Sequence, residues 1–94
     1  MATTNEDVIR VIAYREGEVW VAQCLEHDIS AQGGDFQTAI RRLTATVNAE
    51  CHYTLATHGE AFATIDPAPE HFEHMFGAVE QSLKAERLDV RIAA

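Results

Sequence analysis

The apolar residues of this chain change their spacing across a pair of glycines, Gly33 and Gly34. Before the pair, residues 19–24 alternate with a period of two, which is the pattern of a strand with two distinct faces. After it, the apolar residues recur every three or four positions and line one side of a helix. They are Phe36, Ile40, Leu43, Val47, Cys51 and Leu55. The change of period therefore predicts that strands are followed directly by a helix.

Three strands are expected before the glycines. Residues 8–15 are apolar and rich in β-branched side chains on both faces, so this strand should be covered from two sides. The polar turn at Gly17 joins it to residues 18–25 as an antiparallel hairpin. A second turn, around 26–28, leads to a third strand at 29–32. Because both connections are short, the strands should form a meander.

A long helix is expected after the glycines, which let the chain reverse without a Cβ clash. Asp35 is placed to accept hydrogen bonds from the first turn, and Gly59 is a natural C-cap just after the end near Thr57. The apolar stripe should pack on one side of the meander, with the polar side of the helix in solvent.

The last third of the chain predicts a second helix and a final strand. Residues 60–66 fit either a short strand or a loop. Asp66, with Pro67 and Pro69 after it, is expected to begin and cap a helix. Its apolar stripe consists of Phe72, Met75, Phe76, Val79 and Leu83. Residues 88–93 alternate like a half-buried strand, which could close its own sheet or add to that of a second subunit.

These elements predict a single α+β domain over residues 1–94. A frayed segment at 1–7 precedes the core at 8–59, in which a long helix packs on an antiparallel meander, and 60–94 supply the second helix and the final strand.

Charge limits the classes of partner. The chain has 15 acidic and 7 basic residues, a formal net charge of -8. It has no cluster of Lys and Arg to neutralise phosphates, so direct binding of nucleic acid is not expected. An acidic surface suits a basic protein partner, or it simply keeps a small protein in solution.

Location follows from what the sequence does not contain. No apolar run approaches the ~20 residues that cross a bilayer, and the first residues do not follow the layout of a signal peptide, so we expect a cytoplasmic protein without a membrane segment. Cys24 and Cys51 should then be reduced and act as small core residues.

Two groups of potential metal ligands occur. His71 and His74 are spaced i, i+3 among glutamates, and Cys24 and His27 could combine with Cys51 and His52. The first pair reads more simply as a solvated helix face, and the helical stripe already explains Cys51. We therefore predict neither a metal nor a cofactor.

The sequence also shows no residues spaced like the nucleophile and base of an active site. Neither Ser30 nor Ser82 has the surroundings of an activated nucleophile, and Cys24 near His27 has no third member. Glu26 and Asp28 could act as acid and base or hold Mg²⁺, but acidic residues at a strand end are typical of a turn. The chain is not expected to be an enzyme.

Residues 18–50 resemble the N-terminal domain of the HicB family, antitoxins of bacterial toxin–antitoxin pairs. The resemblance lies in the strand Val19–Leu25 and in the helix opening formed by Gln32, Gly33, Gly34, Asp35 and Ala39. It implies a β-β-β-α core similar to a truncated ribonuclease H fold, which forms dimers or tetramers and masks the active site of HicA, a small basic ribonuclease toxin.

The chain departs from that pattern in three places. Residues 24–28 replace the usual proline-containing loop, and Phe36 stands where threonine is common. Residues 60–94 are acidic and lack the basic DNA-reading element of typical HicB antitoxins, which indicates a solitary HicB-like protein. The strands 8–15 and 18–25 also lack the carboxylates that ribonuclease H chemistry needs.

Two hypotheses follow. The first is a non-enzymatic, oligomeric HicB-like interaction module that binds a basic protein such as a HicA-type toxin. Its candidate contact residues are Trp20, Glu26, His27 and Asp28, an aromatic anchor beside a charged loop; Trp20 could equally pack under the helix. The second is a small metal- or ligand-binding protein that uses His27, Asp28, His71 and His74.

Overall fold

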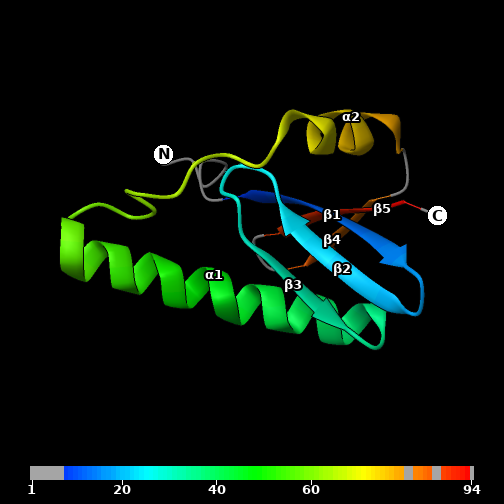
Figure 1. Cartoon of the computed structure of the whole chain (residues 1–94), viewed down its shortest axis with the longest axis horizontal. Helices are drawn as coiled ribbons and strands as arrows, with labels where there is room; N and C mark the ends of the chain where they lie inside the picture. Colours follow the sequence, from blue (N-terminus) through cyan, green and yellow to red (C-terminus); the bar gives the residue numbers. More distant parts are fainter. Residues whose placement is uncertain (1–7, 80–81, 86–87, 94) are drawn as a thin grey trace.

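A computed structural model describes residues 8–79, 82–85 and 88–93. The elements in order are β1 (Ile9–Glu16), β2 (Val19–Cys24), β3 (Ser30–Gly33), α1 (Phe36–His58), α2 (Glu70–Ala78), β4 (Ser82–Ala85) and β5 (Leu88–Ile92). The strands form one mixed sheet in the order β3-β2-β1-β5-β4 (Figure 1). The predicted α+β class, the meander and the long helix are confirmed. The expected frayed segment 1–7 lies outside the described residues.

The sheet is larger than the meander. Strand β5 confirms the strand predicted at 88–93 and pairs in parallel with β1 of its own sheet, with Val11 opposite Val90. Strand β4 was not predicted, and it pairs antiparallel with β5. Leu83, expected on the second helix, is therefore part of a strand. The central position of β1, between β2 and β5, accounts for its apolar sequence.

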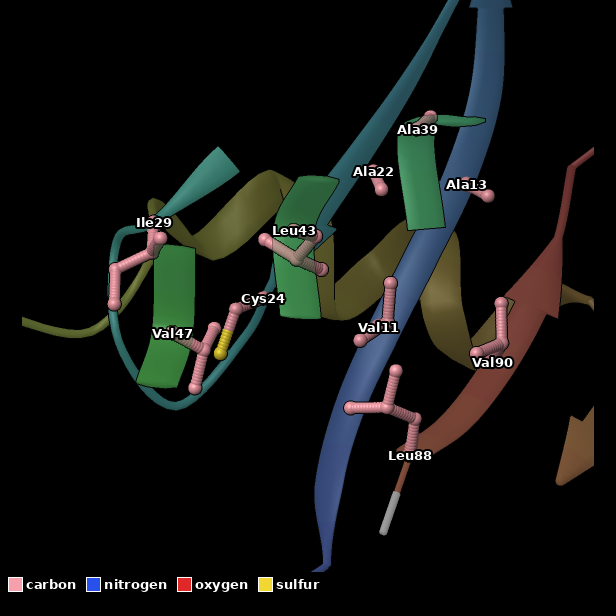
Figure 2. Packing of buried hydrophobic residues seen from close by; sticks show 10 residues of the cluster. All are labelled: Val11, Ala13, Ala22, Cys24, Ile29, Ala39, Leu43, Val47, Leu88 and Val90. Atoms are coloured by element: carbon pink, nitrogen blue, oxygen red, sulfur yellow. The ribbon is translucent and has the colours of Figure 1, made fainter. Parts of the chain in front are cut away.

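Helix α1 covers one face of the sheet. Its buried side chains meet those of β1, β2 and β5 in a core cluster, shown in Figure 2. The cluster consists of Val11, Ala13, Ala22, Cys24, Ile29, Ala39, Leu43, Val47, Leu88 and Val90. Several of its members, such as Val11 and Leu43, are completely inaccessible to solvent. The two-residue alternation read in β2 is thus confirmed, because Ala22 and Cys24 face the helix together.

The opposite face of the sheet is covered by the shorter helix, α2 (Figure 1). Phe72 and Phe76 of α2 form a second buried cluster with Ile12 of β1 and Leu25. Strand β1 is accordingly buried on both faces, as its sequence indicated. The helices lie on opposite sides of one sheet and do not share a core.

Helix α1 has the predicted caps. The Asp35 carboxylate accepts the Thr38 backbone N–H at 2.7 Å, and Gly59 ends the helix in the left-handed conformation at φ 78°. The predicted stripe is wrong at its end, because Leu55 is 47% exposed and Thr54 is buried instead. Figure 1 shows the reason: the last turns of α1 extend past the strands, and there is no sheet beneath them.

The second helix begins later than predicted. Asp66 does not cap it; Pro69 holds the cap position without a side-chain hydrogen bond. The physical reason is that the backbone before the helix is used elsewhere: the Asp66 carbonyl accepts the Asp28 N–H, and the Ala68 N–H donates to Leu25. A proline also holds the residue before it in an extended conformation, so residues 66–69 run along the sheet end.

Residues 60–66, for which strand and loop were both open, form a turn and a loop. Phe62 has φ 61°, which is unusual for a residue with a side chain. Its N–H donates to Thr54 Oγ1 at 2.6 Å, and its carbonyl accepts the Ile65 N–H. These bonds hold Phe62 in place and provide a partner for the buried Thr54 hydroxyl. Among the described residues, no helix combines the length and apolar character needed to cross a bilayer.

Of the two glycines at the period change, only Gly33 is sterically required. A Cβ on Gly33 would lie 2.7 Å from the Ala39 nitrogen, whereas a Cβ on Gly34 would meet nothing within 4 Å. We expect Gly33→Ala to lower the free energy of unfolding by about 1–3 kcal/mol, because α1 must move off β3 to admit the methyl group. Gly34→Ala is the matched control and should change it by less than about 1 kcal/mol. Urea titration of both variants measures this, and equal effects would contradict the close approach.

Candidate functional site

Three of the four predicted contact residues, Glu26, His27 and Asp28, lie in the turn between β2 and β3. Its backbone is bonded on both sides: the Leu25 N–H donates to the Arg10 carbonyl at 3.0 Å, and the Asp28 N–H donates to the Asp66 carbonyl at 2.7 Å. The turn is therefore held between β1 and the segment that leads into α2. Its conformation depends on residues about 40 positions later in the chain, which a local reading does not reveal.

Glu26 is bound to Arg10. Its carboxylate accepts the Arg10 backbone N–H at 3.0 Å and the side-chain Nε at 2.6 Å. The other two guanidinium nitrogens, Nη1 and Nη2, donate to both oxygens of Glu73 on α2, at 3.1 and 2.8 Å. One arginine thus joins the turn, the central strand and α2. Both carboxylates raise the pKa of Arg10, and the largest cause is the hydrogen bond that Arg10 donates to Glu26.

At the same end of the molecule, two arginine side chains lie over one aromatic ring, that of Phe76. The guanidinium carbon of Arg91 lies 4.3 Å from the centroid of Phe76, and that of Arg10 lies 5.5 Å away. Arg91 also donates to the carbonyls of Phe76 and Val79 at 3.2 and 2.7 Å. These two bonds place a cation at the C-terminal end of α2, a position at which positive charge is favourable.

His27 packs on Phe62. The two rings are stacked with their centroids 3.9 Å apart and their planes 16° from parallel. Burial lowers the pKa of His27 below its ordinary 6.5, and the nearby Glu26 raises it only in part. His27 is therefore an uncharged contact between the turn and the 60–66 loop at neutral pH, not a charged rim residue.

Asp28 remains exposed, but its carboxylate is partly engaged. Gln23 donates from Nε2 to Asp28 Oδ1 at 3.0 Å and to the Cys24 carbonyl at 2.9 Å. The Gln23 side chain is buried within the turn and orders it from inside. Of the three turn residues predicted as contacts, Asp28 is thus the one whose side chain is most available to a partner.

Trp20 is not beside this turn. It lies near the opposite end of β2 and meets Phe36 edge to face, with centroids 5.5 Å apart. It is half-buried against the α1 side of the sheet, where it joins the margin of the core. Trp20 therefore packs beneath the helix, which is one of the two roles expected for it. The structure does not bring Trp20 together with Glu26, His27 and Asp28.

The possible metal ligands are not assembled. Within residues 8–79, 82–85 and 88–93, no group of three or more His, Cys, Asp and Glu side chains is placed to hold a metal ion. His71 and His74 are exposed on α2, and His71 packs on Phe72 with centroids 4.0 Å apart. His27 is stacked on Phe62 instead.

Cys24 is a core residue. It is completely buried beneath α1, and burial raises the pKa of its thiol to about 11. A thiol with such a pKa is protonated at neutral pH and is a poor nucleophile. Cys24 and His27, which the sequence places three positions apart, therefore do not behave as a nucleophile and its base.

Sequence reasoning missed Arg10, Glu73, Gln23 and Phe62, which hold the turn in place. The signal available for Arg10 was weak: it is a cation flanked by apolar residues in a strand, and such a residue needs a carboxylate partner when it is partly buried. Nothing local indicates that Glu73 lies beside Arg10 or that Phe62 lies beside His27. No family model, no curated protein and no solved structure matches the chain.

We expect Arg10→Gln to destabilise the fold by about 1–2 kcal/mol, because it removes three charge-assisted bonds, although about a third of the Arg10 side chain is in contact with water. Arg15→Gln is the control, since the exposed Arg15 side chain makes a long, 3.5 Å hydrogen bond to the Gly17 carbonyl. Denaturant unfolding monitored by circular dichroism gives both values. A difference smaller than about 0.5 kcal/mol between the variants would mean that the Arg10 network adds little.

We expect Phe62→Ala to raise the pKa of His27 towards 6.5, because the main cause of the lowered pKa is burial. Phe62→Leu should raise it less, since leucine keeps more of the cover. Because the folded protein binds the His27 proton more weakly than the unfolded chain, stability should be complete above pH 6.5 and fall as pH drops towards the folded pKa. NMR titration of the imidazole protons tests the first point; an unchanged pKa in Phe62→Ala would contradict it.

Proposed function

We propose that the protein is a non-enzymatic, oligomeric HicB-like interaction module that binds a basic protein partner, of which a HicA-type ribonuclease toxin is the best candidate. The observation that carries the proposal is a contiguous acidic surface around the β2–β3 turn and the start of α2. We call it the acidic end. It consists of Glu26, Asp28, Asp66, Glu70 and Glu73.

The contacts described above join these residues into one surface. The backbones of Asp28 and Asp66 are hydrogen bonded, and Arg10 bridges Glu26 to Glu73. Glu70 lies one helical turn before Glu73. The guanidinium of Arg10 offsets part of this charge, but Asp28, Asp66, Glu70 and Glu73 are all exposed. Complementary charge accelerates association and selects the correct partner.

The state of the reactive side chains agrees with a binding role. The Cys24 thiol is buried, with a pKa near 11, and the His27 imidazole is stacked on Phe62. Glu26 is bound to Arg10 and lies in a structural network rather than beside an activated group. A rigid scaffold with an ordered turn and a charged rim is well suited to recognising a folded partner, because little conformational entropy is lost on binding.

The acidic end also limits the choice of partner. Phosphate backbones would be repelled by it, which agrees with the expected lack of nucleic-acid binding. A small ribonuclease has the opposite charge, because it binds an anionic substrate. A protein that covered such an enzyme with carboxylates would occupy the surface that RNA uses. The proposed mode of inhibition is therefore electrostatic competition combined with steric cover.

The test uses the tagged full chain to capture partners from its own cells at low salt, followed by mass spectrometry and measurement of affinity with the purified partner. We expect a small basic protein that is released by salt. The variant Asp66→Asn/Glu70→Gln should bind it about tenfold or more weakly, since two rim charges are lost.

The control variant is Glu16→Gln/Glu18→Gln, which removes the same charge at the β1–β2 turn. It should bind nearly as well as the unmodified protein. Equal weakening by the two variants would mean that only net charge matters, and a captured partner that is acidic would contradict the proposal.

A further inference from the structure

We propose that two copies of this chain associate about a two-fold axis by pairing their β3 edges, with the two α1 helices side by side on the same face of the joined sheet. This deepens the oligomeric part of the proposed function, on which it rests, by naming the surface and the occupant. The partner is a second copy of the chain.

The outer edge of β3 carries backbone groups that point away from the sheet. The Cys24 N–H donates to the Ile29 carbonyl, and the same register pairs Ala22 with Ala31. Because hydrogen-bonded and non-bonded pairs alternate in an antiparallel ladder, Ser30 and Gln32 direct their N–H and C=O groups outward. Neither residue is charged or proline, the features that most often block an edge.

Helix α1 presents a matching side beside this edge. Arg42 donates from Nη1 to the outward Gln32 carbonyl at 3.0 Å, which shows which side of the helix faces the edge. On this side, at helical spacing, lie Arg42, Ala45, Ala49 and Tyr53, which we call the edge flank. All four are exposed, and Tyr53 has 62% of its surface in contact with water. Two alanines permit close approach of a neighbouring helix, and an exposed tyrosine is a typical interface anchor.

Two-fold symmetry brings these features together. Antiparallel pairing about Ala31 would place Ser30 of each copy opposite Gln32 of the other, so that each outward donor meets an acceptor. The Gln32 carbonyl has two lone pairs and can accept from Arg42 and from the second strand together. Since α1 runs back along β3 (Figure 1), the two α1 helices would lie antiparallel.

Charge along α1 suits the antiparallel arrangement. The helix has two arginines, Arg41 and Arg42, both in its first third. Its one carboxylate, Glu50, lies in its second half. An antiparallel neighbour therefore brings the basic part of each helix towards the acidic part of the other. A parallel neighbour would place like charges together.

The test is sedimentation equilibrium of the full chain over a wide range of concentration, with variants on the two sides of α1. Ala49→Arg places a long cation on the edge flank and should weaken the dimer about tenfold or more. Asn48→Arg is the matched control, because Asn48 is an exposed neighbour on a different side of the helix; it should leave the dimer intact. Tyr53→Lys is a second variant on the edge flank, with the same expected loss.

Amide hydrogen exchange provides a readout that locates the contact. The Ser30 and Gln32 N–H groups should exchange slowly in the dimer and rapidly in Ala49→Arg, while the core amides of β1 stay protected in both. A monomeric wild type, a dimer that survives Ala49→Arg and Tyr53→Lys, or fast exchange at Ser30 and Gln32 in the dimer would each overturn the inference. Capture of a basic partner by a monomeric chain would leave the proposed binding of that partner standing, while the oligomeric part of the proposed function and this inference fail.

Discussion

Strand β1 has apolar side chains on both of its faces, so the sheet needs cover on two sides. Val11 and Ala13 pack under α1, and Ile12 packs under α2. Burial of a branched aliphatic side chain contributes roughly 1.5–3 kcal/mol, and each face of β1 can make that contribution only if its helix is in place. The central strand therefore requires both helices, and the parallel strand β5 fills its second edge.

The two helices meet this need by different means. Helix α1 is long, capped at both ends and packed along the meander at the point where Gly33 permits close contact. Helix α2 has nine residues and no side-chain cap, and an isolated helix of that length is unstable in water. It is held by two buried phenylalanines, by Glu73 on Arg10 and by Arg91 at its last carbonyls. The position of α2 therefore depends on its contacts with the rest of the fold.

Tertiary contacts also fix the conformation of the β2–β3 turn. Arg10, Gln23 and Phe62 each engage one residue of the turn, and together they convert a chain reversal into an ordered surface. Asp28 and the acidic residues near the start of α2 remain directed to solvent. The acidic end lies on this turn and on the start of α2, whereas the edge flank lies on α1.

Local pattern was enough to predict β1, β2, β3, α1 with its caps, and β5, because strand alternation, helical spacing and glycine caps are short-range properties of the sequence. The strand β4, the start of α2 and the burial of Thr54 in place of Leu55 could not be predicted in this way. The candidate site likewise has features that the sequence determines and features that only the tertiary structure determines. The sequence alone placed Glu26, His27 and Asp28 in one turn and gave the chain its net acidity. Only the tertiary structure decided that Glu26 binds Arg10, that His27 stacks on Phe62 and that Trp20 lies elsewhere, because each of these contacts joins segments that are brought together by the packing of the whole sheet.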